Sequence, residues 1–232
     1  VSGEGDLKDF VDMKASQVGL KMMEEEAVTL NEPLTQNFIR QLHKTIIRED
    51  YTVHRQLPGG QQKSYTIHAG MYKTRPNSVI TRYGDRFDYA SPEETPALMT
   101  DLVDWYNEAE ASGKYTPVEL AALFHYRYIR IHPFEDGNGR LARILSDMLL
   151  ARADKSEFRF YNISSQINKD KNHYYEVLEK TQHGEGDITE WISWYAKTLF
   201  KALDDAEAAI SVILNKSLFW QKASSVVLSQ RQ

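Results

Sequence analysis

Twelve consecutive residues, from His132 to Arg143, bring together side chains that could act on a phosphate group. They read HPFEDGNGRLAR and lead into an apolar run with helical spacing. His132 could accept a proton near neutral pH, and Asp136 supplies a carboxylate of the kind that holds Mg²⁺ beside phosphates. Arg140 and Arg143 could grip the same anion, because they lie three residues apart on the first helical turn. Together these groups fit attack of a hydroxyl on a phosphate of a nucleotide.

The glycines of this segment add a backbone site for an anion. Gly137 and Gly139 flank Asn138 just before the expected helix, where glycine lets the backbone approach a ligand closely. The first N–H groups of a helix are unpaired and carry partial positive charge, so an anion-binding concavity is expected here. Each feature alone also has a purely structural explanation: a turn, a helix cap, or an exposed ion pair between Arg143 and Asp147. The functional interpretation depends on their combination.

Apolar spacing along the chain predicts a mostly helical protein around this segment. Helices are expected near residues 6–29, 38–46, 92–111, 117–131, 138–153, 169–182 and 188–213. Thr116 and Glu119 have the spacing of a capping box at the start of helix 117–131. That helix is apolar on nearly every side, as buried central helices are, so His132 is expected to sit on a rigid support. His125, two turns earlier, is expected to be a hydrogen-bonded core residue.

The β signal falls between residues 64 and 90, where β-formers gather. A hairpin is expected at about 78–89, with Gly84 and Asp85 as its two-residue turn, protruding from the helical body. Lys73 and Arg75 lie near this hairpin in the sequence and are expected to keep it soluble rather than to bind a partner.

Composition places the protein in an ordinary soluble globular class. The chain has 232 residues, 41% apolar and 26% charged, which suits one domain or one domain with an appendage. Its net charge of −5 argues against direct binding to nucleic acid or to an anionic membrane. The absence of cysteine excludes thiol catalysis, disulfide scaffolds and cysteine-ligated zinc. With no apolar run of bilayer length and no signal peptide, we expect a cytoplasmic protein, and the start at Val1 indicates a fragment of a longer chain.

The segment 132–143 resembles the signature of the Fic (Fic/Doc) family, H-x-F-x-[DE]-G-N-G-R-x-x-R, and matches it at every specified position. An upstream hairpin flap and the pair Tyr174 and Tyr175 extend the resemblance, which covers about residues 34–200. It implies an all-α fold, a Fic-type helical bundle with a β-hairpin flap beside the active-site loop. The expected divisions are a helical lead-in at 1–33, a catalytic core at 34–205 with the flap at about 70–90, and a C-terminal helical extension at 206–232 that leads to a missing domain.

The resemblance also implies a mechanism, because Fic proteins with this motif mostly transfer AMP from ATP to a hydroxyl of a target protein. His132 would be the general base, Asn138 would help to stabilise the α-phosphate, and Asp136 would bind Mg²⁺. The nucleotide-binding residues implied are Asp136, Gly137, Asn138, Gly139, Arg140, Leu141, Ala142, Arg143, Tyr174, Tyr175 and Gln182. The flap residues Val79, Ile80, Thr81 and Arg82 would align the target segment by strand addition. Gln182 stands where other members often have Asn, and its amide could serve similarly.

Regulation and partners are less fully specified by the resemblance. Many Fic proteins are inhibited by a helix bearing [ST]-x-x-x-E-[GN], and residues before 34 contain no match. Residues 181–186 fit the letters but are rejected, because Gly184 and Gly186 indicate a loop. We therefore expect an inhibitory helix outside this chain. The alternatives are a Fic enzyme that transfers another nucleotide or removes AMP, a non-catalytic nucleotide-binding regulatory module, and a DNA-binding regulator with a secondary Fic part; a homodimer also stays open.

Overall fold

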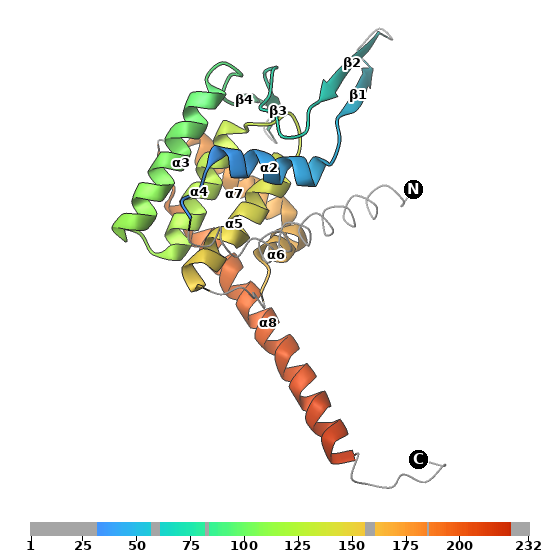
Figure 1. Ribbon diagram of the computed structural model, residues 1–232, viewed down its shortest axis with the longest axis vertical. Helices are drawn as coiled ribbons and strands as arrows, with labels where there is room; N and C mark the ends of the chain where they lie inside the picture. Colours follow the sequence, from blue (N-terminus) through green and yellow to red (C-terminus); the bar gives the residue numbers. More distant parts are fainter. Residues whose placement is uncertain (1–31, 57–60, 82–83, 156–160, 185, 224–232) are drawn as a thin grey trace.

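The computed structural model describes residues 32–56, 61–81, 84–155, 161–184 and 186–223 of a mostly helical protein (Figure 1). The helices pack into a bundle, and two small antiparallel hairpins lie together at one end of it (Figure 1). The predicted helical bundle with a β-hairpin is thus confirmed. The predicted helix at 6–29 lies outside the described residues.

The helices follow the predicted pattern with two differences. They are α2 (Gln36–Ile47), α3 (Thr95–Ser112), α4 (Pro117–Ile131), α5 (Asn138–Asp154), α6 (Ile163–Lys169), α7 (Lys171–His183) and α8 (Thr189–Ala223). The helix predicted for 169–182 is confirmed as α7, but the short α6 before it was not predicted; Asp170 leaves helical geometry and separates the two. Asn162 caps the short α6 by accepting a hydrogen bond from the Ser165 N–H at 3.0 Å. The last helix ends at Ala223 instead of 213.

Local capping explains why α4 begins at Pro117. The Thr116 hydroxyl accepts a hydrogen bond from the Glu119 N–H at 3.3 Å, and the Glu119 carboxylate accepts one from the Thr116 N–H at 2.8 Å. The predicted capping box is therefore confirmed. Ser91 and Glu94 exchange the same pair of bonds, at 3.1 and 3.2 Å, just before α3.

Helix α4 runs through the centre of the bundle and packs against α3, α5 and α8. Ala122, Phe124 and Tyr128 are completely buried. The Trp191 indole of α8 donates a hydrogen bond to the Ala122 carbonyl at 2.8 Å, which ties the two helices together in the core. The prediction of a buried central helix is confirmed, so the residue that follows it, His132, has a rigid support.

The two hairpins differ in how visible they were in the sequence. Strands β3 (Ser78–Ile80) and β4 (Arg86–Asp88) form the predicted hairpin, but the predicted two-residue turn at Gly84 and Asp85 is wrong. The Thr81 N–H donates to the Asp85 carbonyl at 2.8 Å, so Asp85 lies opposite Thr81 and the connection is longer, with Gly84 in the left-handed region at φ 85°. Strands β1 (Tyr51–Gln56) and β2 (Gln62–Ile67) form a second hairpin, in which Tyr51 pairs with Ile67. Strand β1 was missed because its side chains are polar and mostly exposed, so they show no buried alternating face.

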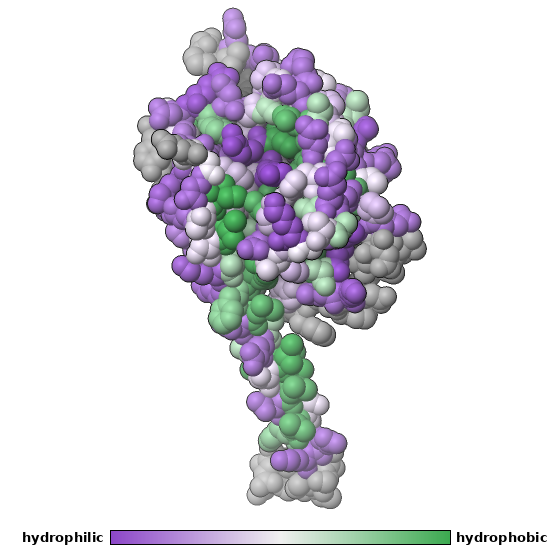
Figure 2. Space-filling view, turned by 90° about the vertical axis from the view of Figure 1, so that its left-hand side faces the viewer, coloured by the Kyte–Doolittle hydropathy of each residue, from purple (hydrophilic) through white to green (hydrophobic). Residues whose placement is uncertain are grey.

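The second half of α8 projects away from the bundle (Figure 1). Ala202 is its last buried residue in the described part of the chain. Beyond it, apolar side chains such as Ile213 and Trp220 are 66% and 58% exposed, and Figure 2 shows apolar surface along this shaft. Among the described residues, no helix has the combination of length and apolarity that crossing a membrane requires.

Candidate active site

A pocket of about 350 Å³ opens where the loop after α4 meets α5, α7 and the β3–β4 hairpin. This volume falls within the range of about 300–1,000 Å³ that is typical of small-molecule sites. Its lining consists of Val79, Tyr89, Ile129, His132, Glu135, Asp136, Gly137, Asn138, Gly139, Arg140, Arg143, Lys171, Tyr174, Tyr175, Leu178, Glu179 and Gln182. The pocket thus gathers most of the site residues that the sequence indicated.

Some predicted site residues lie elsewhere. Leu141 and Ala142 are completely buried in the core and do not line the pocket. Ile80 and Thr81 are not among the lining residues, although the neighbouring Val79 is. Arg82 lies outside the described residues.

His132 caps the C-terminus of α4 in a left-handed conformation, at φ 52° and ψ 58°. Its Nδ1 lies 3.4 Å from the Ile129 carbonyl oxygen. Since a carbonyl only accepts hydrogen bonds, this contact favours the neutral tautomer with the proton on Nδ1 and the lone pair on Nε2. The Tyr89 ring stacks on the imidazole with centroids 3.9 Å apart. These contacts fix both the orientation and the tautomer of a base.

The electrostatic environment keeps His132 neutral. Burial and the positive charge of Lys73 lower the pKa of His132 to about 4, against smaller opposing effects of the Ile129 carbonyl and Asp136. At neutral pH the ring is therefore unprotonated and able to accept a proton.

Lys73 is a structural support that the sequence analysis misjudged. Its side chain is buried, and its Nζ donates hydrogen bonds to the carbonyls of Ile131, at 3.0 Å, and His132, at 2.9 Å. The expectation that it solubilises the hairpin is wrong, because it closes the C-terminal end of α4, where a cation is favoured. Burial lowers the pKa of Lys73 to about 8.

Buried side chains hold the loop between α4 and α5 in place. The Asn138 side chain accepts a hydrogen bond from the Phe134 N–H at 3.0 Å and donates one to the Phe134 carbonyl at 2.7 Å. Phe134 is completely buried and stacks on His43 with ring centroids 3.8 Å apart. Asn138 therefore positions the loop, in addition to any contact that it makes with a ligand.

The N-terminus of α5 is open to an anion. Gly137 occupies the N-cap position with φ 79° and, as a glycine, supplies no capping side chain to this end of the helix. A Cβ at Gly137 would lie 3.2 Å from Ile47 Cδ1, so both the backbone angle and the space favour glycine. The predicted concavity thus has its backbone donors.

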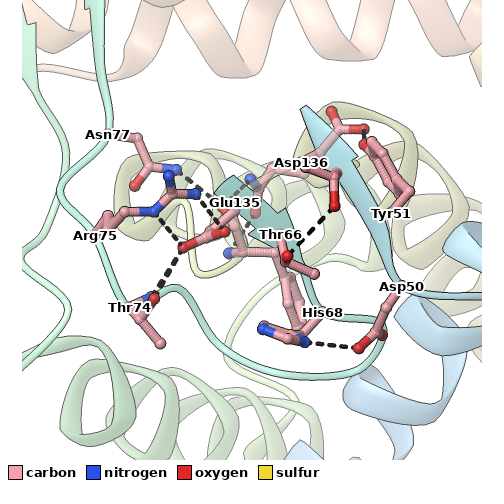
Figure 3. Close-up of polar contacts among 12 residues, drawn as sticks. Asp50, Tyr51, Thr66, His68, Thr74, Arg75, Asn77, Glu135 and Asp136 are labelled. Carbon is pink, nitrogen blue, oxygen red and sulfur yellow. Dashed lines mark hydrogen bonds and ion pairs between the residues drawn. The ribbon is translucent and has the colours of Figure 1, made fainter. Parts of the chain in front are cut away.

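Asp136 and the two arginines stand at this helix end. Asp136 Oδ2 accepts a hydrogen bond from Arg140 Nη2 at 3.1 Å. It also accepts one from the Tyr51 hydroxyl at 2.6 Å (Figure 3). Tyr51 belongs to the unpredicted strand β1, so nothing in the local sequence pointed to it.

Arg143 and Asp147 are only 7% and 4% exposed, which rules out the alternative of an exposed ion pair between them.

Helix α7 supplies the opposite wall. Tyr174 is buried, and its hydroxyl lies 3.0 Å from His125 Nε2, while His125 Nδ1 lies 2.8 Å from the Ser146 hydroxyl. His125 is thus confirmed as a hydrogen-bonded core residue. Tyr175 is exposed at the pocket.

Lys171 and Leu178, which the sequence analysis missed, also line this wall. Helical periodicity from Tyr175 could have found both, because Lys171, Tyr175, Leu178 and Gln182 follow one another at helical spacing along α7.

The side chains at the pocket suit a metal ion bound together with a nucleotide better than a metal ion held by protein side chains alone. In the described part of the chain, no three His, Cys, Asp or Glu side chains cluster as a metal site would require. Asp136 places one carboxylate directly before the N-terminus of α5, and Mg²⁺ is commonly held by one or two carboxylates while phosphate oxygens and water complete its shell. Asp136 therefore fits Mg²⁺ that arrives with a nucleotide.

Residues 33–150 match the model of the Fic/DOC family. The chain belongs to this family. The resemblance of the 132–143 motif is thereby confirmed.

Curated relatives of this Fic domain carry a consistent name. The protein adenylyltransferase Fic of Nematostella vectensis is 29% identical over 207 residues, which cover 88% of this chain and 44% of that protein. The protein adenylyltransferase fic-1 of Caenorhabditis elegans is 42% identical over 71 residues, or 31% of this chain and 14% of that protein. The chain thus spans less than half the length of these relatives.

Solved structures confirm the fold of this Fic domain. A Fic-domain signaling protein from Bacteroides thetaiotaomicron is similar over 89% of this chain and 74% of that chain, with a TM-score of 0.69 and 43% identity. Fic-1 from C. elegans shares the fold over 87% of this chain and 51% of that chain, with a TM-score of 0.60 and 22% identity.

Proposed function

We propose that this Fic domain is a protein adenylyltransferase that transfers AMP from ATP to a Tyr, Thr or Ser hydroxyl of a target protein. The observation that carries the proposal is the neutral, stacked imidazole of His132 in one pocket with the open N-terminus of α5 and with Arg140 and Arg143. The names of the curated relatives support the same activity.

The reaction follows from these groups. The acceptor oxygen attacks the α-phosphorus of ATP and forms a new P–O bond, while the bond to the bridging oxygen breaks and pyrophosphate leaves. His132 Nε2 takes the proton of the acceptor hydroxyl. Bound Mg²⁺, held by Asp136, would neutralise phosphate charge.

The remaining pocket residues bind and orient the nucleotide in this proposal. Backbone amides at Gly137 and Gly139 would stabilise the developing charge on the α-phosphate. Arg140 and Arg143 would hold the β- and γ-phosphates, because guanidinium groups match phosphate oxygens in bidentate geometry. The adenosine part would lie against α7, where the lining residues include Tyr174, Tyr175 and Gln182.

The β3–β4 hairpin would place the acceptor. Val79 lines the pocket that contains His132, and in the described sheet β4 is the only strand paired with β3. An extended target segment that pairs with the other edge of β3 would bring its hydroxyl to the base. Ile80, Thr81 and Arg82 would continue this docking edge.

The proposal extends to the rest of the chain. Residues 34–205 would form the catalytic core, and 206–232 would lead to a further domain of a cytoplasmic protein. We propose that an inhibitory helix lies outside this chain. The rejected match at 181–186 begins at Thr181 within α7 and runs into the loop before α8, while its Glu185 lies outside the described residues.

The test compares ATP labelled at the α-phosphorus with ATP labelled at the γ-phosphorus. The chain is incubated with Mg²⁺, a mixture of cellular proteins as acceptors, and ATP labelled at the α- or the γ-phosphorus. We expect only the α label to become protein-bound, and His132→Ala to abolish its transfer. His173→Ala, which removes a half-exposed imidazole of α7 outside the pocket lining, is the matched control and should transfer normally.

Other outcomes contradict the proposal in distinguishable ways. Protein-bound γ label alone would indicate a kinase. Binding of ATP in a calorimeter without transfer of either label would indicate a non-catalytic nucleotide-binding module. Release of AMP from a previously modified protein would indicate the reverse activity.

A further inference from the structure

A second groove, of about 410 Å³, lies beside the active-site pocket between the two hairpins. Lys63 and Tyr65 of β2 form one wall, and Asn77 and Ser78, at the start of β3, form the other; Arg75, Pro76 and Glu135 complete the lining. Glu135 also lines the active-site pocket. The groove and the pocket are therefore neighbours on one surface.

The groove is positively charged. Arg75 donates from Nε and Nη2 to the two carboxylate oxygens of Glu135, at 3.1 and 2.7 Å (Figure 3), and its guanidinium lies 3.5 Å from the centroid of the Tyr65 ring. This pairing balances the charge of Glu135, whose side chain is 9% exposed. The side chain of Lys63 is exposed and makes no ion pair or hydrogen bond with another described residue, and Arg75 Nη1 donates no hydrogen bond within the described chain. With Glu135 balanced by Arg75, the Lys63 ammonium gives the groove lining a net positive charge.

The strands on either side suit an extended segment. In the described sheets, β2 pairs only with β1 and β3 pairs only with β4, so each has an edge without a partner strand. Backbone groups along such edges favour the addition of another strand. Because Ser78 of β3 lines the groove and Val79 lines the pocket, a segment that pairs with β3 would pass from the groove to the pocket.

Along such a segment, the groove and the active-site pocket are only a short distance apart. Ser78 lines the groove, whereas the next residue, Val79, lines the pocket that contains His132. A strand rises about 3.3 Å per residue, so two or three positions span about 7–10 Å along its axis. At this distance from the acceptor hydroxyl, a target side chain on the face that meets the groove would reach Lys63 and Arg75.

We propose that this groove is a second target subsite, which binds an Asp or Glu side chain two or three residues from the acceptor hydroxyl. The inference rests on the proposed adenylyltransferase function and adds a charge preference to its target. Target segments with a carboxylate at this position would be selected over neutral or basic segments.

Peptide binding tests the subsite without requiring catalysis. Fluorescent peptides of extended sequence, each with one Tyr acceptor, carry Glu, Gln or Lys two and three positions away on either side. Their dissociation constants are measured by anisotropy with the His132→Ala chain. We expect the Glu peptides to bind about fivefold more tightly than the Gln peptides, and the Lys peptides to bind more weakly still.

A charge-reversal pair identifies the groove as the cause. Lys63→Glu should remove or reverse the preference, because it places a carboxylate in the groove. Lys216→Glu makes the same change of net charge on the projecting part of α8 and should leave the preference intact. Equal affinity for all three peptide classes, or equal effects of the two variants, would overturn the proposal.

AMP transfer to the same peptides by the unmodified chain separates the two proposals. Transfer with no dependence on peptide charge refutes the subsite but supports the adenylyltransferase. A Lys63-dependent binding preference in the absence of any transfer refutes the activity but supports the groove.

Discussion

The Tyr89 ring lies parallel to the imidazole of His132, with centroids 3.9 Å and planes 14° apart. Tyr89 follows β4 directly, and its N–H donates to the Asn77 carbonyl at 3.1 Å, so the same residue belongs to the flap and supports the base. The β3–β4 hairpin, which is proposed to bind the acceptor segment, therefore contacts the proposed base, His132, through Tyr89.

Removing this ring should slow catalysis more than it weakens nucleotide binding. Aromatic stacking of this kind contributes about 0.5–1.5 kcal/mol, so Tyr89→Ala should lower kcat for AMP transfer by up to about tenfold. Tyr89→Phe keeps the ring, so its kcat should stay close to that of the unsubstituted protein. Single-turnover rates and calorimetric ATP affinities would be compared. A large loss of ATP affinity with an unchanged rate would mean that the ring serves the nucleotide instead.

The low pKa of His132 predicts an unusual pH profile. A base works in its unprotonated form, so the rate should fall only as pH drops toward about 4 and should be flat from about pH 6 to 8. An ordinary histidine would lose half its activity near pH 6.5. The check is the single-turnover rate as a function of pH, with circular dichroism confirming the fold at each point. A midpoint near pH 6.5 would contradict the burial argument.

Replacing Lys73 should move that profile in a defined direction. The positive charge of Lys73 helps to lower the pKa of His132, so Lys73→Met should raise this pKa and shift the acidic limb to higher pH. Burial remains, so the midpoint should stay below 6.5. The variant also leaves the carbonyls of Ile131 and His132 without their donor, and should cost about 1–3 kcal/mol of unfolding free energy in urea titrations. An unshifted limb in a folded variant would contradict the electrostatic effect.

The parts of the site that could be predicted are those encoded by neighbours in the chain. The motif residues His132 to Arg143 are contiguous, and the Thr116 capping box that starts α4 needs only three positions. Such features depend on local backbone geometry, which a short stretch of sequence determines. The tyrosine pair of α7, Tyr174 and Tyr175, was found from the family resemblance instead.

The parts that could not be predicted depend on contacts between distant positions. Lys73 closes α4 across 58 positions, and Tyr51 reaches Asp136 across 85. Neither contact leaves a periodic pattern, and Lys73 is buried although lysine is usually exposed. Only the packed fold brings these groups together.

The hydrogen bond from the Tyr51 hydroxyl to Asp136 should affect the Mg²⁺ concentration that AMP transfer requires. Burial and the hydrogen bond to Asp136 raise the pKa of Tyr51, so the hydroxyl stays protonated and donates to Asp136 Oδ2 at 2.6 Å. A donor of this kind orients a metal-binding carboxylate, and losing one typically costs about 10–100-fold in metal affinity. Tyr51→Phe should therefore raise the Mg²⁺ concentration for half-maximal AMP transfer about tenfold, while the rate at saturating Mg²⁺ changes little.

A matched control exists outside the pocket, where the Tyr161 hydroxyl donates to Asp154 Oδ2 at 2.7 Å. Tyr161→Phe removes an equivalent hydrogen bond and should leave the Mg²⁺ requirement unchanged. If Tyr51→Phe gives the same Mg²⁺ dependence as Tyr161→Phe, the hydroxyl does not orient Asp136 for the metal. If it instead lowers the Mg²⁺ requirement, Tyr51 competes with the metal for the carboxylate, and the β1–β2 hairpin must then release Asp136 before the nucleotide complex can bind.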